Sequence, residues 1–560
     1  LLISSLTYSQ TNTININFRS PVDIPIYLSG NFGEIRSSHF HAGIDIKTQG
    51  VIGKKIYAVE EGYISRIKVS INGYGKTIYI DHPNGYTTVY GHLSRFNSRI
   101  DKLVKELQYQ NNEFEINYFP DSGELTIKKG EVIGYSGNTG SSEGPHLHFE
   151  TRETNNQIPV NPLIFNLDIK DNISPIPYTL AIYPLNRNSK VNNSNQIMQF
   201  KLKKINGAYT IADTNQISLL GETGFGIEMY DYLNGSRNKC GIYSLSLFID
   251  SLLIYNHDID KFSFYETGYV KSHIDYAEKL KSKKTIQKAF IARNNNLSIY
   301  KSEINRGVFK FVSDKTYNIL FLISDVYGNE TKLVLNAKGH SLFNNNDIIQ
   351  TASSGVFMDW QTENIFEDDE IKITIPNKSL FDTLYFKYSK SEPECRAYSK
   401  VHHIHNKYTP LYKDYTLSIE THNLPNVLKD KAFIAEIVEN EFNSIGGDIV
   451  NGRIVSEVSS FGDFVVLIDT ISPEIKPLTD LSTLKEEEIR FMIKDDLTGI
   501  KSFNGYIDND WALFEYDQKN DLLFYKIDHS RIEKKIEHEL ELFVIDNKNN
   551  ISTYYTTFYW

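Results

Sequence analysis

The sequence predicts a mainly β protein of several domains, and three observations support this prediction. The chain has 560 residues, which at about 100 to 200 residues per domain corresponds to three or four domains. Its 36 tyrosines and 32 phenylalanines against only 4 methionines favour half-buried pleated surfaces over helices. Apolar residues alternate with polar ones in short segments separated by Asn, Asp and Gly turns. We therefore expect an N-terminal β-sheet domain with one inserted short helix, followed by about three Ig-like β-sandwich domains.

Charge and hydropathy exclude some classes of protein. The net charge of −11 includes no long basic block, so we expect no nucleic-acid partner. No run of 18 apolar residues occurs, so we expect no transmembrane segment. The first ten residues, LLISSLTYSQ, resemble the tail of a secretory signal or an ordinary terminus, and residues 1–19 are assigned to a leader remnant or N-terminal extension. Cys240 and Cys395 fall in different predicted domains, so a disulfide between them is not expected.

The first domain is predicted at residues 20–167, where glycine and histidine are dense. Within it, SRIDKLVKELQ from Ser98 has apolar residues at i, i+3, i+4 and i+7, which predicts an amphipathic helix with a capping box at Ser98 and Asp101. EFEINYF, from Glu113, returns to the alternation of a strand. The helix lies in a predicted insertion at residues 97–122.

An internal repeat divides the rest of the chain. Three segments recur in the same order, namely DNISP at Asp171 as DTISP at Asp469, GIYSLSLFID at Gly241 as GIKSFNGYID at Gly499, and DVYGN at Asp325 as DNKNN at Asp546. We expect a β-sandwich with insertions at 168–340 and a compact one at 469–560. Residues 341–468 between them are expected to form a third β-rich domain.

Two histidines in the first domain share one face of a predicted strand. In the segment EGPHLHFE, His146 and His148 are two residues apart and project together, while Leu147 and Phe149 project to the opposite face and can anchor the strand. An HxH pair alone more often has a structural role than a metal-binding one.

Two further segments strengthen the case for a metal site. In HFHAGIDI, His41 and Asp45 are four residues apart and lie on one side of either a strand or a helix. With another imidazole they form a three-ligand set that leaves the fourth position of zinc open for water, as in catalytic sites. In TVYGHLS, period two places His92 on one face with Thr88 and Tyr90.

Four ordered motifs, HFHAGID, YGHLS, KKGEVIGYSGNTG and GPHLHFE, resemble the lysostaphin-type M23 zinc metallopeptidases, endopeptidases that cut peptide bridges in bacterial cell walls. The resemblance covers about residues 31–150. It implies a small β-sheet peptidase domain with a duplicated hybrid motif like that of lipoyl and biotinyl domains. It also implies that His41, Asp45 and His148 bind one catalytic zinc ion, and that His92 and His146 are catalytic histidines outside the ligand set.

The same resemblance implies a zinc-dependent endopeptidase that hydrolyses stem or cross-bridge peptides of peptidoglycan with a zinc-activated water. The alternatives are a non-catalytic envelope scaffold or activator of another wall hydrolase, and a carbohydrate-binding or adhesion protein. All five site positions are kept, which favours activity. We expect a secreted or periplasmic protein of the cell envelope whose C-terminal β domains contact an envelope partner. About thirty residues separate the HLS motif from the Gly-rich run, and we hypothesise that this insertion borders the cleft and limits which substrates enter.

Two other segments have weaker signals. The HHIH cluster at residues 402–405 is predicted to be an exposed loop rather than a second metal site. Calcium at the turn from Asp325 to Asn329 is a weaker interpretation than hydrogen bonding within an Asx turn.

Overall fold

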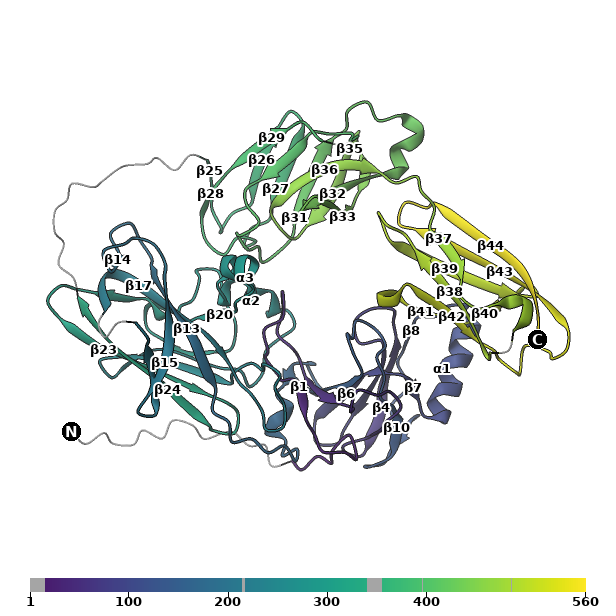
Figure 1. Ribbon diagram of the computed structural model, residues 1–560, viewed down its shortest axis with the longest axis horizontal. Coiled ribbons are helices and arrows are strands. Elements are labelled where there is room, and N and C mark those ends of the chain that lie inside the picture. The colour runs from purple at the N-terminus through teal and green to yellow at the C-terminus, as the bar shows by residue number, and fades with distance from the viewer. Residues whose placement is uncertain (1–15, 214–216, 340–354, 395, 485) are drawn as a thin grey trace.

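The computed structural model describes residues 16–213, 217–339, 355–394, 396–484 and 486–560, and β-sheets dominate it. The described chain forms four units that follow one another around a ring (Figure 1). The prediction of a mainly β protein is confirmed, whereas the domain limits stay predictions. Most of the predicted leader and the whole of Cys395 lie outside the described residues. Among the described residues, no helix is long and apolar enough to cross a membrane.

The N-terminal unit is built on an antiparallel sheet with the order β1-β2-β11-β6-β5-β4-β8, to which β12 and β9 add at β11 and β4. A smaller sheet has the order β3-β10-β7. The bounds are β1 (Leu28–Gly30), β2 (Ile44–Lys47), β3 (Lys55–Tyr57), β4 (Gly62–Val69), β5 (Lys76–Asp81), β6 (Tyr86–Leu93), β7 (Arg95–Phe96), α1 (Ser98–Asn111), β8 (Ile116–Tyr118), β9 (Thr126–Ile127), β10 (Val132–Tyr135), β11 (His146–Glu153) and β12 (Pro159–Val160).

Strand β11 lies in the middle of the N-terminal sheet. Leu147 and Phe149 are fully buried in the apolar core of this unit, as the period-two pattern predicts. His148 therefore projects to the opposite face, between β2 and β6. The apolar anchors on one face thus position the histidines on the other.

The predicted grouping on β6 is wrong for His92. The register between β5 and β6 shifts next to His92, whose φ is 59°, and this irregularity breaks the alternation of faces. The ring of Tyr90 packs edge-on against Phe149 in the core, whereas the ring of His92 packs against His146. Thr88 stays with Tyr90 and donates a hydrogen bond to its hydroxyl.

The predicted helix is confirmed as α1, and the strand after it as β8. Ile100 and Val104 of α1 are buried against the core. The predicted capping box is wrong by one residue, because Asn97 is the N-cap and its side chain accepts a hydrogen bond from the Ile100 amide. Asp101 instead accepts from the amide of Phe96.

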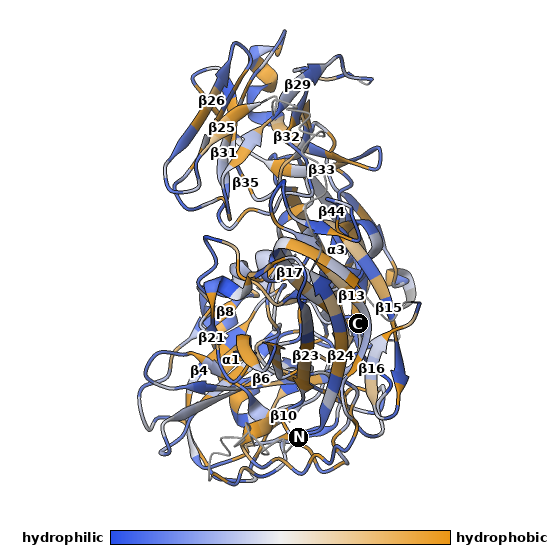
Figure 2. Cartoon of the chain, turned by 90° about the vertical axis from the view of Figure 1, so that its left-hand side faces the viewer, coloured by the Kyte–Doolittle hydropathy of each residue, from blue (hydrophilic) through white to orange (hydrophobic). Residues whose placement is uncertain are grey.

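The second unit is a large sheet with the path β14-β17-β13-β15-β16-β24-β23-β18-β19-β21, which encloses its own apolar core. Strand β24 alternates exposed and buried residues along its whole length, and Figure 2 shows such alternation as blue and orange bands on the strands. The bounds are β13 (Ile176–Pro184), β14 (Lys190–Val191), β15 (Met198–Ile205), β16 (Ala208–Ile211), β17 (Ile217–Tyr230), β18 (Ser244–Ile249), β19 (Leu252–Asp258), α2 (Val270–His273), α3 (Tyr276–Ser282), β20 (Ile286–Lys288), β21 (Tyr300–Glu303), β22 (Phe309–Phe311), β23 (Thr316–Ser324) and β24 (Glu330–Gly339).

In the third unit, a sheet of order β26-β27-β31-β35-β34 packs on one of order β29-β30-β36-β32-β33 around a shared core, and β25 pairs with β28. The bounds are β25 (Val356–Met358), β26 (Asn364–Asp368), β27 (Ile371–Ile375), β28 (Leu384–Phe386), β29 (Tyr388–Ser391), β30 (Val401–Ile404), β31 (Tyr415–Glu420), β32 (Ala432–Val438), β33 (Glu441–Gly446), β34 (Asp448–Val450), β35 (Arg453–Val458) and β36 (Gly462–Ile468). The prediction of an exposed loop at HHIH is wrong, since its first three residues belong to β30 and His402 is fully buried.

The fourth unit packs a sheet of order β37-β38-β42-β41 on one of order β40-β39-β43-β44. The bounds are β37 (Glu474–Pro477), β38 (Glu488–Lys494), β39 (Ile500–Ile507), β40 (Asp510–Ala512), β41 (Phe514–Asp517), β42 (Leu522–Lys526), β43 (Glu537–Asp546) and β44 (Ile551–Tyr559).

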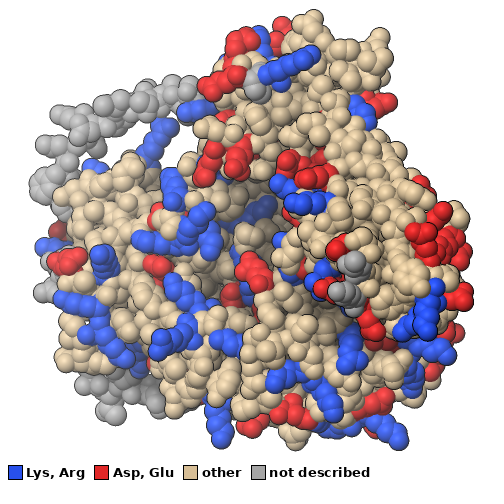
Figure 3. All heavy atoms as spheres, turned by 45° about the vertical axis from the view of Figure 1, so that its right-hand side comes forward, with Lys and Arg blue, Asp and Glu red and all other residues tan. Residues whose placement is uncertain are grey.

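The fourth unit closes the ring against the first. Lys105 of α1 forms an ion pair of 2.7 Å with Asp528, and the Tyr109 ring meets Trp511 edge-on. The helix inserted in the first unit is thus a docking surface for the C-terminal sandwich. Figure 3 shows a hollow at the centre of the ring, with lysine, arginine and acidic side chains mixed around it.

A half-buried ion pair joins the same two units. Lys76 Nζ lies 2.7 Å from Glu515 Oε2, and the two side chains are 14% and 19% exposed. Replacing Lys76 with Met leaves Glu515 only a longer contact of 3.7 Å with Lys526. We expect Lys76→Met to cost about 1–3 kcal/mol at this interface and to speed amide hydrogen exchange in β41 and β42.

The matched control for this prediction is Lys102→Met. Lys102 lies on the solvent side of α1, 80% exposed and 3.9 Å from Glu106, so its replacement should change stability by less than about 0.5 kcal/mol. Equal melting temperatures and equal exchange in the two variants would contradict the expected role of the Lys76 pair.

Candidate metal centre and active site

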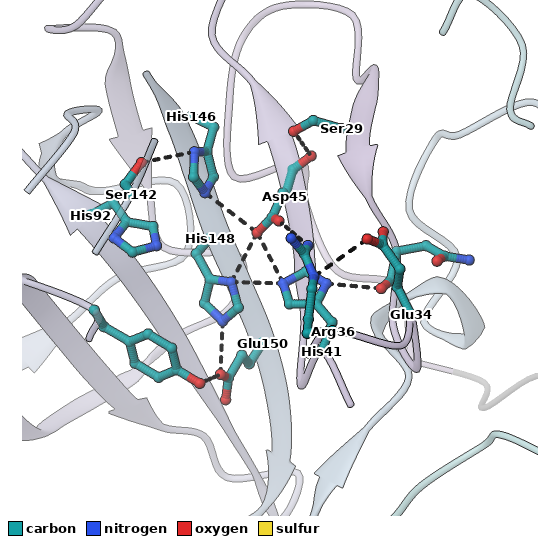
Figure 4. Close-up of polar contacts among 12 residues, drawn as sticks. Ser29, Glu34, Arg36, His41, Asp45, His92, Ser142, His146, His148 and Glu150 are labelled. Carbon is teal, nitrogen blue, oxygen red and sulfur yellow. Dashed lines mark hydrogen bonds and ion pairs between the residues drawn. The ribbon is translucent and has the colours of Figure 1, made fainter. Parts of the chain in front are cut away.

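Strand pairing brings the predicted metal ligands together. Asp45 on β2 lies opposite His148 on β11, and His148 lies opposite Gly91 on β6. His41 comes from the segment just before β2 and turns towards both residues (Figure 4). The register of three neighbouring strands therefore builds the site from segments about a hundred residues apart.

The facing atoms of His41, Asp45 and His148 form a small triangle. Asp45 Oδ1 lies 3.0 Å from His41 Nε2 and 2.9 Å from His148 Nδ1, and the two nitrogens are 3.1 Å apart. All three residues are buried, with exposures of 7%, 8% and 3%. The structure thus brings together the three residues that the sequence predicts as ligands.

Hydrogen bonds on the outer sides of both rings determine which nitrogen faces the triangle. His41 Nδ1 donates to the carbonyl of Asn31 over 2.8 Å, which leaves Nε2 with a free lone pair. His148 Nε2 donates to Glu150 Oε1 over 2.8 Å, so Nδ1 is the nitrogen that faces Asp45 Oδ1. Imidazoles that bind metals are oriented in this way by a carbonyl or carboxylate on their other nitrogen.

This donor set fits zinc. Two imidazole nitrogens and one carboxylate oxygen match the ligand types of catalytic zinc sites, which keep a fourth position open. Ligands about 2.0–2.1 Å from a tetrahedral ion lie about 3.3 Å from one another, so a shift of a few tenths of an ångström would admit the ion.

The electrostatics of the pocket favour positive charge at the triangle. Burial alone would lower the pKa of His148, but hydrogen bonds to Asp45 and Glu150 outweigh it and raise this pKa to about 9. Burial would raise the pKa of Asp45, yet the charge of His41 and hydrogen bonds from His146 and His148 hold it well below its usual range. Burial also lowers the pKa of His41. The buried carboxylates thus create a potential that suits a cation.

His146 and His92 lie beside the triangle without belonging to it. His146 Nδ1 donates to the Gly144 carbonyl over 2.8 Å, and its Nε2 lies 3.4 Å from Asp45 Oδ1. His92 Nδ1 donates to the Thr139 carbonyl over 2.8 Å, and burial lowers its pKa to about 3. The His92 ring is 4.8 Å from that of His146. In both rings Nδ1 is held by a backbone carbonyl, so Nε2 is the nitrogen left without a backbone partner.

Sequence reasoning missed the residues that support the ligands. Glu150 is fully buried, pairs with Arg152 over 2.6 Å and accepts a hydrogen bond from Tyr74. Arg36 Nη2 lies 2.9 Å from Asp45 Oδ2 and leaves Oδ1 to face the histidines. Period two could have identified Glu150, which is two residues after His148 on the same strand. No sequence spacing indicates Arg36 or Tyr74.

A cavity of about 560 Å³ lies next to the site, between the first and fourth units. Its lining includes Asn138 and Ser142 from the segment before β11, and Lys519 from the turn after β41. Ser142 contacts His146 Nδ1 at 3.2 Å, so the cavity adjoins the candidate active site. Lys519 donates hydrogen bonds to the carbonyls of Asn138 and Gly140.

Two family models match this chain. Residues 39–109 and 121–162 match the model described as Peptidase family M23, and residues 355–469 match the model described as a Zu5-like domain. The first match contains all five predicted site residues.

Curated relatives resemble the same part of the chain. A protein of Neisseria meningitidis named DD-carboxypeptidase/endopeptidase Mpg is 38% identical over 123 residues, which are 22% of this chain and 22% of the relative. Peptidoglycan DD-endopeptidase ShyC of Vibrio cholerae is 34% identical over 142 residues, which are 24% of this chain and 26% of that protein. The chain therefore spans only about a quarter of the length of these relatives.

A solved structure of a zinc-containing peptidase from Vibrio cholerae is 25% identical and covers 28% of this chain and 41% of its own. The TM-score of this match is 0.20.

The contact between Glu150 and His148 leads to a prediction on metal affinity. Glu150→Gln keeps the shape of the side chain but removes the charge that His148 and Arg152 face, so we expect zinc affinity to fall about 10- to 100-fold. Competition titration with a chromogenic chelator measures it, with circular dichroism as a check on folding. Glu153→Gln is the control, because this residue lies at the end of the same strand and pairs with Lys261 away from the site. Equal zinc affinities in the two variants would disprove the supporting role of Glu150.

Proposed function

We propose, from the match of residues 39–109 and 121–162 to the M23 peptidase model, that this chain is a zinc-dependent endopeptidase of the bacterial cell envelope. Its substrates are peptide bonds in the stem or cross-bridge peptides of peptidoglycan. The observation that carries this proposal is the convergence of His41, Asp45 and His148 beside His146 and His92. The name of one matched relative, a peptidoglycan DD-endopeptidase, supports the substrate class.

His41 Nε2, Asp45 Oδ1 and His148 Nδ1 would hold the zinc ion. When bound, zinc supplies Lewis-acid chemistry, which lowers the pKa of a water and polarises the scissile carbonyl. Asn31 and Glu150 keep the two imidazoles in the required tautomers, and Arg36 holds Asp45 in place.

His146 and His92 move and hold protons beside the metal ligands. His146 Nε2 is the closer of the two to Asp45 Oδ1, so it accepts the proton of the attacking water and later donates it to the leaving amine. His92, whose pKa is lowered by burial, stays neutral and orients the water through Nε2. The carbonyls of Gly144 and Thr139 anchor the two rings for this work.

The surroundings of the site restrict what it can bind. The cavity beside His146 has one wall in the first unit and the other in the fourth, so a substrate peptide would meet the C-terminal sandwich as it enters. Helix α1 supports this arrangement through its contacts with Asp528 and Trp511. The predicted insertion would thus limit substrates indirectly, because it holds the C-terminal sandwich near the groove.

A non-catalytic scaffold is the second candidate function. It would use the same ring of β units to bind an envelope partner, and it would not need the five site residues to be kept together. Zinc content together with hydrolysis of purified muropeptides separates the two functions, since a scaffold that binds zinc would release no products.

Replacing His146 tests the catalytic assignment. We expect His146→Ala to reduce kcat about 10²- to 10⁴-fold while the chain keeps one zinc ion, because the removed ring moves protons but does not bind the metal. Muropeptide hydrolysis followed by chromatography measures the rate, and elemental analysis measures zinc. His39→Ala is the control, since His39 belongs to another HxH pair but is exposed. Loss of zinc from His146→Ala, or full activity in it, would refute the assignment.

The ligand chemistry also predicts a loss of activity in acid. His41 and His148 bind metal only as neutral imidazoles, so protons compete with zinc as the pH falls. We expect zinc content and hydrolysis to decline together between neutral pH and pH about 4 and to recover when zinc is added back at neutral pH. Full activity at pH 4 would exclude this ligand set.

A further inference from the structure

Three aspartates meet at one end of the second unit. Asp171 precedes β13, Asp231 follows β17 and Asp325 follows β23. One carboxylate oxygen of each lies within 4.8 Å of the other two. Asp231 and Asp325 are both 3% exposed, so the cluster is buried rather than solvated.

Hydrogen bonds from the described residues compensate this cluster only in part, at Asp171 Oδ1 and at both oxygens of Asp325. None of the three aspartates forms an ion pair there, and Asp171 Oδ2 and Asp231 Oδ1 are buried without any hydrogen-bond donor. The carboxylate of Asp231 points into the cluster, and its unpartnered oxygen is shielded from water. Burying a carboxylate without a donor or a counter-charge is costly, so a bound cation would relieve a cost that the described side chains do not offset.

The sequence repeat provides an internal comparison, because the fourth unit has an equivalent cluster of Asp469, Asp495 and Asp546. The turns match closely. Asp325 Oδ1 accepts from the Asn329 amide, and Asp546 Oδ1 accepts in the same way from the amide of Asn550.

The two clusters differ in the hydrogen-bond donors that their aspartates receive. In the fourth unit the Thr498 hydroxyl donates to Asp469 Oδ2 over 2.6 Å, and the amides of Thr498 and Gly499 donate to Asp495 Oδ2. In the second unit, the longer loop after Asp231 donates to Asp171 Oδ1 through the Asn234 amide, and no described residue donates a hydroxyl to the three aspartates. Protein donors thus reach all three aspartates of the fourth unit, whereas Asp171 Oδ2 and Asp231 Oδ1 of the second unit receive none from the described residues.

We propose that Asp171, Asp231 and Asp325 form a calcium-binding site at the junction between the first and second units. Carboxylate oxygens are hard ligands, which favour calcium or magnesium over zinc. Magnesium keeps several of its waters and demands a regular octahedron, whereas calcium accepts irregular sets of carboxylates from separate loops. Three buried carboxylates from separate segments therefore fit calcium. The Asx-turn hydrogen bonds predicted at Asp325 are present, and the other two aspartates provide the open oxygens.

The proposed calcium site lies at the base of the loop 231–240, which is followed by a contact with the first unit. The backbones of Asp231 and Cys240 exchange two hydrogen bonds of 2.9 Å, which close the loop. Next to it, the side chain of Asn31 donates to the Gly241 carbonyl and accepts from the Gly241 amide, each over 2.7 Å. Asn31 is also the residue whose carbonyl holds His41. Calcium would therefore stabilise the support of a zinc ligand, a consequence that rests on the proposed function, whereas calcium binding itself does not.

Calcium binding to the full, zinc-loaded chain tests this inference. Equilibrium dialysis against about 1 mM calcium, followed by elemental analysis, should show one calcium ion fewer per chain in Asp231→Asn than in the wild type. Calcium should also raise the Tm of the wild type by several degrees and leave the Tm of Asp231→Asn unchanged, and magnesium at the same concentration should not reproduce the shift.

Asp250→Asn is the matched control, because Asp250 is a more exposed aspartate of the same unit that pairs with Lys315 outside the cluster. It should bind as much calcium as the wild type. The proposal would be overturned if the wild type bound no calcium and showed no shift in Tm, or if Asp231→Asn bound as much as Asp250→Asn. Bound calcium is measured without reference to hydrolysis, so an inactive peptidase domain would not affect the result.

Discussion

The antiparallel register of β2, β11 and β6 is the constraint on which the rest of this site depends. Asp45, His148 and Gly91 stand in one row across these strands, so their side chains share one face of the sheet. A slip of one residue in either pairing would turn His148 into the core and Phe149 out of it. Leu147 and Phe149, fully buried on the opposite face, stabilise the register through the hydrophobic effect. The chemistry of the site is therefore maintained by apolar residues that never touch it.

A second layer of buried polar groups makes this geometry specific. Glu150 has no exposure to solvent, yet its two oxygens face His148, Tyr74 and Arg152. Such a network is stabilising only when every member has a partner, because an unpaired buried charge has a large desolvation penalty. The same rule distinguishes the two aspartate clusters of the sandwiches, where one has donors for its carboxylates and the other has open oxygens.

The ring arrangement connects the site to distant parts of the chain. The fourth unit docks on α1 and on the turn before β11, and the second unit holds Asn31 through Gly241. Lys519 binds carbonyls on both sides of Thr139, which anchors His92, and Gly241 binds Asn31, which anchors His41. The β units that follow the first unit thus form part of its walls and supports, which gives a physical reason for their presence in one chain with it.

Much of this arrangement was predictable from sequence where the signal was local. The alternation around His148, the stripe of α1 and the four-residue spacing of His41 and Asp45 are set by the periodicity of strands and helices, which neighbouring residues determine by themselves. The ordered motifs likewise identified all five residues that the structure brings together.

Tertiary structure alone decided what depends on contacts between distant segments. The backbone irregularity that turns His92 away from the face of Tyr90, the approach of Arg36 to Asp45, and the meeting of Asp171, Asp231 and Asp325 have no signature in spacing. These contacts arise from strand register and core packing over tens to hundreds of residues, and no local pattern of the sequence encodes such pairings. Local periodicity therefore determined which side chains share one face of a strand or helix. Packing determined which of these faces meet.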